Sequence, residues 1–471
     1  MVLRNLFSMS IMRVASALLT LALVIVFSRL GGIQQLGLFS LLITLFLFFQ
    51  LLPLAGLHLY LIREISTKPD SARQHLPNAL LLALCVSLLL AVGLGVGGAL
   101  VYRELPEIHA ALWWVALSLI PTAPIAVVEA VLLAQQRMDA VALRNVLENI
   151  GRTAVAVGLV ATGHDLTAVF IVFFVGRVLV ASSYLRSAEL PSLLDFTLLS
   201  AVILRSYLVN MPTFLGITLL SALSSRLDML LMSKLATAEQ LGLYAAVYKL
   251  FEMGLMVPQV ITVVLLPRLG ELRAKSVEAM TQGLVTYLRF PIVLGAPFLI
   301  LMSVNSGLVL SMFGPQAAVG ATALAVLLPA LLGAGINQLL ALAMLVMGRS
   351  DLDLRTLVIG TLMTVVLLVT AIPRWGAVGA ASVALAMSLA LPALRLGFLA
   401  RQLSVGGILR QVGRAFVPAW TMVLVMLASG AFTALAPPVQ AALGLVAYLA
   451  TASALGNLSL VAFSGRFRRD G

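Results

Sequence analysis

Charge is scarce in this 471-residue sequence, where Asp, Glu, Lys and Arg together make up 10% of the residues. A soluble chain carries about a quarter of its residues as charged side chains. Hydrophobic residues reach 61%, and the mean hydropathy is +1.10. The composition excludes a soluble enzyme or a cytosolic nucleic-acid-binding protein. It predicts an integral membrane protein, and the length of its apolar runs predicts that this protein is all-α.

Cysteine and histidine are almost missing as well. The one cysteine, Cys85, lies in the apolar run LLLALCVSLLL, and the four histidines are scattered. This excludes a disulfide framework and a thiolate metal site. The motifs GxSxG and HExxH and a phosphate-cradling glycine loop are also missing from the sequence. We therefore predict no catalytic residue, no metal and no cofactor.

What the sequence has instead is long apolar runs. About 20 apolar residues cross the hydrocarbon core as a helix, and polar, glycine or proline residues divide the chain into fourteen such runs. The predicted spans are 6–27, 37–61, 76–101, 111–134, 140–161, 167–185, 207–232, 241–266, 284–304, 317–347, 354–372, 377–399, 412–435 and 439–463. Arg13 lies inside the first run, which favours a retained span over a cleaved signal peptide.

Basic residues are distributed unequally between the two sets of loops. Alternate segments that begin with the N-terminus hold 21 Lys and Arg residues, whereas the other segments hold four. Because basic loops stay in the cytoplasm, both termini are predicted to be cytoplasmic. The net charge of +12 is thereby explained by topology, and a nucleic-acid partner is not needed.

The sequence also contains an internal repeat. At an offset of 205 residues, 28–63 aligns with 233–268 without gaps, with 11 identities in 36 positions. The offset equals six spans, so the two copies cross the membrane in the same direction. Parallel repeats place a transporter's substrate between them. We predict an N-terminal lobe over 1–186, a cytoplasmic linker over 187–206, a C-terminal lobe over 207–400 and two additional spans over 401–471.

The segments FSRLGGIQQLGLFSLLITLF and SSRLDMLLMSKLATAEQLGLYAAVYKLFE, with LPLAGLHLYLIREIS and VVLLPRL after them, resemble a known family. It is that of the polysaccharide exporters and lipid-linked oligosaccharide flippases of the multidrug/oligosaccharidyl-lipid/polysaccharide (MOP) exporter superfamily. The resemblance implies a V-shaped, two-lobed transporter that works by alternating access in the bacterial inner membrane. It also implies that a glycan linked to a polyprenyl (undecaprenyl) diphosphate moves to the outer leaflet, in the synthesis of an exopolysaccharide or a lipopolysaccharide O-antigen. Membrane lipids and other polysaccharide assembly proteins are the implied partners, and the two extra helices are expected to offer a groove to the lipid tail.

Ionisable side chains inside a bilayer are costly and mark a transport pathway by default. Arginine pairs with phosphate oxygens in a bidentate manner, so the basic residues within the spans are candidates for the substrate's diphosphate. The alternative is that each one pairs with a carboxylate or a carbonyl and holds helices together. The basic candidates are Arg152, Arg177, Arg13, Arg226 and Lys249. The acids predicted to serve coupling or salt bridges are Glu129, Asp228 and Glu252.

Lys249 and Glu252 are three residues apart on one helical face, and we expect them to neutralise each other. Asn337 and Gln338 are candidates for contact with sugar hydroxyls, with hydrogen bonding between helices as the favoured alternative. Gly37 and Gly242 are equivalent in the repeat, and we expect each to allow a tight turn into a helix.

Two rival functions belong to the same superfamily, a multidrug/cation antiporter and a lipid II flippase. The antiporter is disfavoured because the first predicted span offers Arg13 and no carboxylate. A membrane-embedded glycan polymerase or ligase is disfavoured because the outer loops are short, and we predict that the protein is not an enzyme. The glycan, the coupling ion and the oligomeric state are not specified by the sequence.

Overall fold

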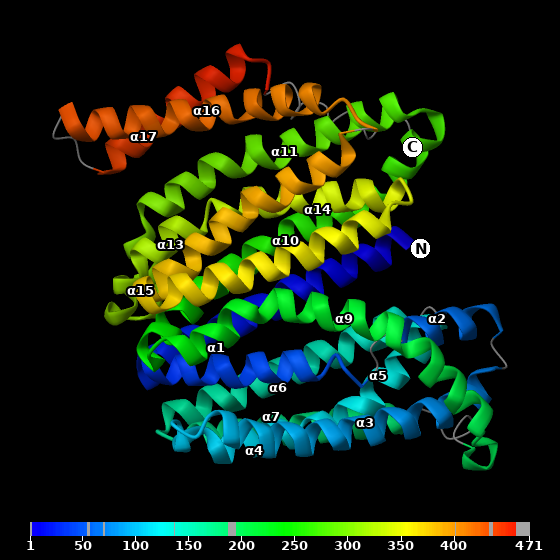
Figure 1. Cartoon of the computed structure of the whole chain (residues 1–471). Helices are drawn as coiled ribbons and strands as arrows, with labels where there is room; N and C mark the ends of the chain where they lie inside the picture. Colours follow the sequence, from blue (N-terminus) through cyan, green and yellow to red (C-terminus); the bar gives the residue numbers. More distant parts are fainter. Residues whose placement is uncertain are drawn as a thin grey trace. The chain divides into compact units, whose positions relative to one another are not determined.

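The computed structural model of the chain describes residues 2–53, 57–68, 71–135, 137–186, 195–400, 402–432 and 437–457. These residues form α-helices, short 3₁₀ turns and connecting segments, with no β-strand among them (Figure 1). In chain order the α-helices are α1 (Val2–Phe49), α2 (Leu57–Thr67), α3 (Ala72–Val101), α4 (His109–Leu117), α5 (Leu119–Ala134), α6 (Met138–Ala161), α7 (Leu166–Leu185), α9 (Ala201–Leu235), α10 (Ala238–Lys275), α11 (Val277–Val304), α12 (Ser306–Leu310), α13 (Ala321–Leu327), α14 (Ala330–Val346), α15 (Ser350–Leu399), α16 (Val405–Phe432) and α17 (Pro437–Ala454).

Within the described part of the chain, eight helices are long and apolar enough to cross a membrane. The number becomes nine if Pro315–Leu327 and Ala330–Val346, which meet at 42°, form one broken span. In hydrocarbon every backbone N–H and C=O must be satisfied internally, and a helix achieves this within one segment. The chain is therefore a multi-pass, all-helical membrane protein, and the count of fourteen spans stays a prediction.

Two of the long helices are bent at a glycine. The 50 residues of α15 would make a straight helix about 75 Å long, more than twice the hydrocarbon thickness of about 30 Å. Gly376 interrupts α15 with φ 53° and ψ −130°, and Gly32 interrupts α1 with φ 81°. Side chains other than glycine rarely adopt this left-handed region. The bend at Gly376 falls between the predicted spans 354–372 and 377–399.

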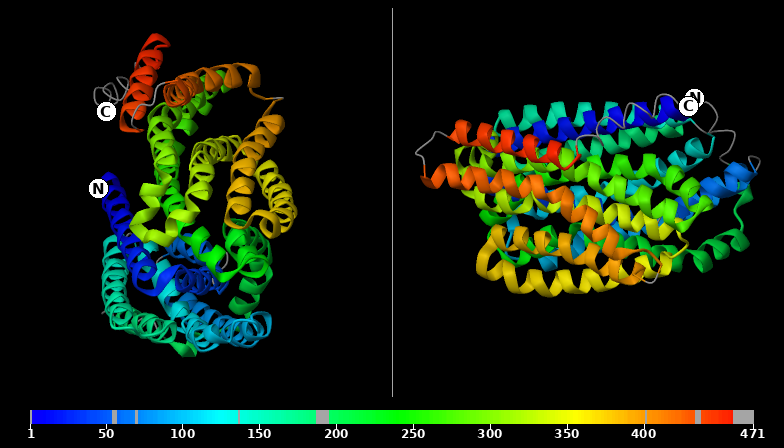
Figure 2. Two further views of the ribbon diagram at one scale, coloured as in Figure 1. Left: turned by 90° about the vertical axis from the view of Figure 1, so that its left-hand side faces the viewer. Right: turned by 90° about the horizontal axis from the view of Figure 1, so that it is seen from above.

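The helices pack into two compact units, Met1–Ala246 and Val247–Gly471, and the boundary falls within α10. In the first unit, small and branched residues of α3 and α5 form a core that Tyr184 of α7 and Tyr207 of α9 complete. In the second unit, α11, α14 and α15 surround a core that includes Leu288, Leu340 and Leu399. The views in Figure 2 show α16 beside α17. Each unit is thus held together by van der Waals packing of apolar side chains along the helices.

Gly37 and Gly242 lie inside helices α1 and α10, so the prediction that they allow tight turns is wrong. A Cβ added to Gly242 would lie 1.8 Å from the carbonyl oxygen of Ile33, and one added to Gly37 would lie 2.7 Å from the amide nitrogen of Gly242. The two repeat-equivalent glycines therefore let their helix backbones touch each other. Small residues serve this purpose between membrane helices.

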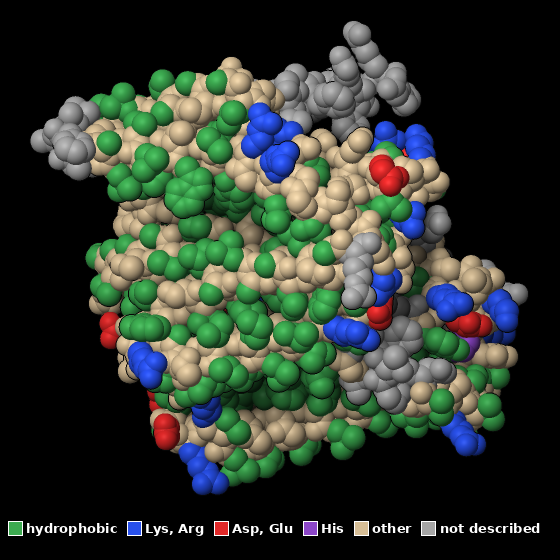
Figure 3. All heavy atoms as spheres, turned by 45° about the horizontal axis from the view of Figure 1, so that its top comes forward, with side chains coloured by type: hydrophobic (Ala, Val, Ile, Leu, Met, Phe, Trp, Pro, Cys, Tyr) green, Lys and Arg blue, Asp and Glu red, His purple; other side chains and the backbone are tan. Residues whose placement is uncertain are grey.

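Large apolar side chains cover the outside of the helices. Examples are Leu89 of α3, 73% exposed, and Leu362 of α15, 63% exposed. Figure 3 shows hydrophobic side chains along the lengths of the helices, with most Lys and Arg side chains toward their ends. This distribution suits a surface that meets lipid tails in the middle and headgroups at the edges.

Candidate functional site

The interior of the first unit contains a network of charged side chains on α6 and α7. Arg144, Glu148 and Arg152 follow each other at intervals of four residues on α6, which places them on one face of that helix. Arg177 reaches this face from α7. The Nε atom of Arg177 lies 3.3 Å from Oε1 of Glu148, and Nη1 of Arg152 lies 3.7 Å from the same oxygen. One carboxylate oxygen thus serves two arginines.

Both ion pairs are loose. Neither contact meets hydrogen-bond geometry, since Oε1 of Glu148 and Nε of Arg177 are both buried without a hydrogen-bond partner. Arg152 instead donates from Nη2 to the side-chain oxygen of Asn149 at 2.9 Å. Arg177 donates to the side-chain oxygen of Gln50 at 3.5 Å. Because buried ion pairs stabilise only when their geometry is good, Glu148 compensates the charge of the two arginines poorly.

Aromatic rings hold the two guanidinium groups in place. The guanidinium carbon of Arg152 lies 4.8 Å from the centre of the Phe173 ring, and that of Arg177 lies 5.1 Å from the centre of the Phe46 ring. These distances are typical of cation–π contacts. The rings themselves are buried, Phe46 at 1% exposed and Phe173 at 4%. The side chains of Arg152 and Arg177 keep 22% and 14% of their surface exposed.

Glu129 on α5 lies next to the arginine network. Its Oε1 accepts hydrogen bonds from Nδ2 of Asn145 and from the hydroxyl of Tyr184, each at 3.0 Å. Arg144 stacks on the Tyr184 ring with 4.5 Å between its guanidinium carbon and the ring centre. Glu129 forms no ion pair among the described residues, and its hydrogen-bond partners are neutral groups. Arg177 attracts its carboxylate only over a longer distance, so the predicted salt bridge is not formed.

With both carboxylates ionised, this cluster carries one net positive charge. It holds three arginines, Arg144, Arg152 and Arg177, against Glu129 and Glu148. An excess charge within a membrane-spanning bundle is costly unless a counterion accompanies it. The arrangement is suited to receive an anion, because two guanidinium forks are fixed close together and share a weakly bonded carboxylate.

Glu148, like Arg144, is a residue of this cluster that the sequence analysis does not identify. It lies within the predicted span 140–161, whereas the predicted acids within spans are Glu129, Asp228 and Glu252. The spacing of four residues between Glu148 and Arg152 was the available signal, because it predicts an ion pair on one helix face. Arg13 lies on α1 among residues whose side chains are outside the described part of the structure.

The other predicted charges are distributed over α9 and α10. Asp228 accepts a hydrogen bond of 2.6 Å from the hydroxyl of the fully buried Tyr244, and this bond links α9 to α10. Arg226 lies half-buried on α9. The predicted neutralisation of Lys249 by Glu252 is confirmed, because Nζ of Lys249 lies 2.9 Å from Oε2 of Glu252. The structure does not bring these residues into the Arg152 network.

In the second unit, Asn337 contributes to a buried polar cluster. Its side-chain oxygen accepts a hydrogen bond from Nη1 of Arg395. Arg395 is 6% exposed, and its Nη2 lies 2.6 Å from Oδ1 of Asp353. For Asn337, the prediction of hydrogen bonding between helices is therefore confirmed. Arg395 is one of the 21 basic residues that the loop-charge count assigns to the cytoplasmic segments, although it falls inside the predicted span 377–399. The structure corrects this assignment, because the residue is buried on α15, where Asp353 compensates its charge.

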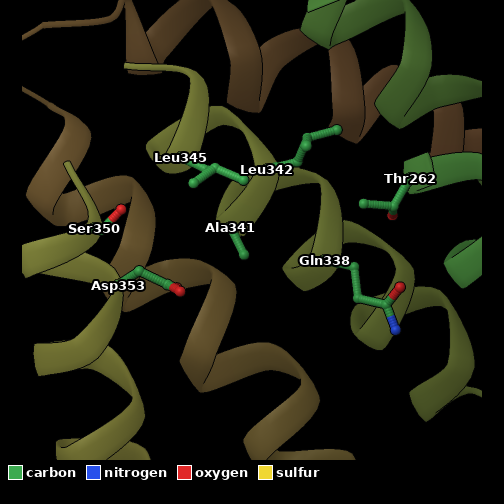
Figure 4. A pocket seen from close by; sticks show the side chains of 7 residues that line it. All are labelled: Thr262, Gln338, Ala341, Leu342, Leu345, Ser350 and Asp353. Carbon is green, nitrogen blue, oxygen red and sulfur yellow. The ribbon is translucent and has the colours of Figure 1, made fainter. Parts of the chain in front are cut away.

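Gln338 lines a cavity of about 310 Å³ in the same unit. Figure 4 shows Gln338 and the apolar side chains of α14, with Thr262 of α10 on one side and Ser350 and Asp353 of α15 on the other. Both hydrogen bonds from Arg395 to Asp353 end on Oδ1. The cavity thus combines an amide, two hydroxyls and a carboxylate with an apolar wall, which are groups able to bind sugar hydroxyls.

The fold is shared with solved membrane transporters. A structure of the lipid II flippase MurJ in an inward closed conformation superposes with a TM-score of 0.71 at 15% identity, over 94% of this chain and 98% of that one. An inward-facing multidrug resistance MATE family transporter of the MOP superfamily gives 0.66 at 12% identity, over 85% and 96%. A MOP superfamily transporter from Pyrococcus furiosus gives 0.58 at 14% identity, over 86% and 95%. The chain has the fold of a MOP superfamily transporter.

The family follows from the sequence itself. The family model described as polysaccharide biosynthesis protein matches residues 2–273, which is more than half of the chain. No curated protein sequence matches the chain. The protein therefore belongs to the polysaccharide biosynthesis protein family, as the resemblance of its repeated segments indicated. The solved structures that share its fold are those of a flippase and of transporters.

Proposed function

We propose that the protein is a flippase that moves a polyprenyl-diphosphate-linked oligosaccharide from the cytoplasmic to the outer leaflet by alternating access. The observation that carries this proposal is that Arg152 and Arg177 share a single carboxylate, that of Glu148, inside a membrane-spanning bundle. The shared carboxylate leaves one arginine charge without a partner. A diphosphate supplies the missing negative charge and can accept from both guanidinium forks.

The first step is the binding of the anionic headgroup. A diphosphate does not enter a low-dielectric region without paired charge, so it binds beside Glu148 as a second anionic partner of Arg152 and Arg177. The rings of Phe46 and Phe173 keep the two guanidinium groups in position. Positioned donors of this kind lower the cost of binding because they need little reorganisation.

Further side chains are assigned to the glycan and to the remaining substrate charge. Gln338 faces the cavity of the second unit and is proposed to contact sugar hydroxyls. Arg13 and Arg226 are proposed as additional basic contacts. Lys249 is a weaker candidate because Glu252 already pairs with it. Glu129 is proposed as the group that exchanges a proton, since its partners are neutral.

The membrane potential supplies a driving force for this transport. An inside-negative potential favours outward movement of anions by about 2.3 kcal/mol per charge per 100 mV. Two phosphate charges therefore gain roughly 4 to 5 kcal/mol at 100 mV. This direction requires the bacterial inner-membrane location and the cytoplasmic termini that the loop charges predict. The proposed lobes are 1–186 and 207–400, with 187–206 as linker and 401–471 as two extra spans.

The test is flipping by the purified protein in liposomes. A fluorescent oligosaccharide on a polyprenyl diphosphate is placed in both leaflets, and its movement is followed with a membrane-impermeant quencher under an imposed potential. Arg152→Ala and Arg177→Ala are each expected to reduce the initial rate at least tenfold. Arg103→Ala, which removes an exposed arginine outside the network, is the matched control and is expected to flip at the wild-type rate.

The same liposomes distinguish the rival functions. Undiminished flipping in both arginine variants would overturn the assignment of the diphosphate site. Proton-driven efflux of a cationic dye without glycan flipping would make the protein a multidrug/cation antiporter. Faster movement of lipid II than of other diphosphate-linked glycans would instead place it with the lipid II flippases.

A further inference from the structure

A second basic site lies where α11 packs against α16 in the second unit. Arg289 of α11 donates from Nη2 to the side-chain oxygen of Asn457 at 2.5 Å and from Nη1 to the side-chain oxygen of Gln411 at 3.4 Å. Asn457 is fully buried, and its Nδ2 donates to the backbone oxygen of Arg414 at 3.4 Å. The buried asparagine thus fixes the Arg289 guanidinium beside the Arg414 segment of α16.

The positive charge at this site is not compensated. No ion pair between described residues includes Arg289, Arg410 or Arg414, and both hydrogen-bond partners of the Arg289 guanidinium are neutral amides. The Nε of Arg289 is buried without an acceptor. Arg414 is near enough to repel Arg289 electrostatically, and Arg410 lies one turn before it on the same side of α16. Such a cluster gains stability when an anion binds to it.

The surface next to the arginines is apolar. Val417, Trp420, Leu424 and Leu427 follow Arg414 along one side of α16, and their side chains are 41%, 65%, 61% and 65% exposed. From Arg414 to Leu427 the helix rises about 20 Å, which exceeds half of a hydrocarbon core of about 30 Å. A soluble phosphate has no apolar part that could contact these side chains. A lipid can place its headgroup at the arginines and an acyl chain along the apolar side of the helix.

We propose that Arg289 and Arg414 form a binding site for the phosphate of an anionic phospholipid, with the acyl chain lying along the exposed stripe of α16. The ligand is a bulk membrane lipid such as phosphatidylglycerol rather than the polyprenyl carrier. The site is separate from the Arg152 and Arg177 network and does not depend on the proposed flipping of a glycan.

Trp420 provides a local probe for the test. In the full-length protein, Trp113, Trp114 and Trp375 are replaced by Phe, so that Trp420 alone fluoresces. The protein is reconstituted in mixtures of phosphatidylcholine with brominated phosphatidylglycerol, or with brominated phosphatidylcholine as the neutral comparison. Each basic residue near an anionic surface strengthens lipid binding by about fivefold. We expect at least a fivefold preference for phosphatidylglycerol, and we expect Arg289→Gln/Arg414→Gln to abolish it.

The control and the competing ligand decide the outcome. Arg355→Gln removes an exposed arginine of α15 and is expected to keep the preference, which separates a specific site from general surface charge. Equal quenching by the two brominated lipids in the parent protein would overturn the proposal. It would also be overturned if the preference persisted in the double variant, or if a polyprenyl phosphate displaced phosphatidylglycerol at an equal mole fraction.

Discussion

The replacement Glu148→Gln removes the carboxylate that Arg152 and Arg177 share. The glutamine keeps the shape and the polarity of the side chain but not its charge. Two guanidinium groups on α6 and α7 then face each other without an anion. We expect the variant to be less stable than the parent protein, because an unpaired buried charge is more costly than the loss of the pair itself.

The size of the effect follows from the burial of the three side chains. Removing one partner of a buried ion pair costs about 3 to 5 kcal/mol. Glu148 is 5% exposed, but the side chains of Arg152 and Arg177 retain 22% and 14% of their surface. Water therefore relieves part of the unpaired charge. The pairs are also longer than hydrogen bonds, so we expect a loss near the lower limit, about 3 kcal/mol.

The assay is reversible unfolding in mixed detergent micelles, followed by circular dichroism. Glu104→Gln serves as the control, because Glu104 is exposed and outside the network, and it should leave the free energy of unfolding unchanged. Adding Arg177→Leu to Glu148→Gln should restore part of the lost stability by removing one unpaired charge. The reasoning is refuted if Glu148→Gln is as stable as Glu104→Gln, or if the second replacement destabilises the protein further.

Two other predictions concern packing and a second ion pair. Gly242→Ala should lower the melting temperature and the flipping rate, since its Cβ would lie 1.8 Å from a backbone oxygen. Gly93→Ala, which has open space around its Cβ, is the control. Equal melting temperatures and flipping rates of the two variants would contradict the close contact at Gly242. Asp353→Ala should destabilise the protein more than Arg395→Met, because Arg395 is 6% exposed whereas the Asp353 side chain is 40% exposed and remains hydrated. Unfolding measurements that reverse this order would show that Asp353 is not the main partner of Arg395.

The sequence alone determined the class of the protein. The low content of charge and the long apolar runs predict a bundle of helices in lipid, because a helix satisfies the hydrogen bonds of its backbone within one segment. The repeated segments were specific enough to indicate the family. The break near Gly376 was also predictable, because proline and glycine interrupt a helix at identifiable positions. Lys249 and Glu252 were predicted as a pair because their contact is local, within one turn.

The tertiary structure decided which distant side chains meet. Glu148 meets Arg177 only because α6 packs against α7, and Arg395 meets Asp353 only because α15 folds back after Gly376. The spacing of apolar residues does not predict these contacts between distant side chains, since a lipid-facing residue and a helix-facing residue are equally hydrophobic in a membrane protein. The face that each charge occupies therefore depends on helix packing, and only the packing separates a paired arginine from one that is available to an anion.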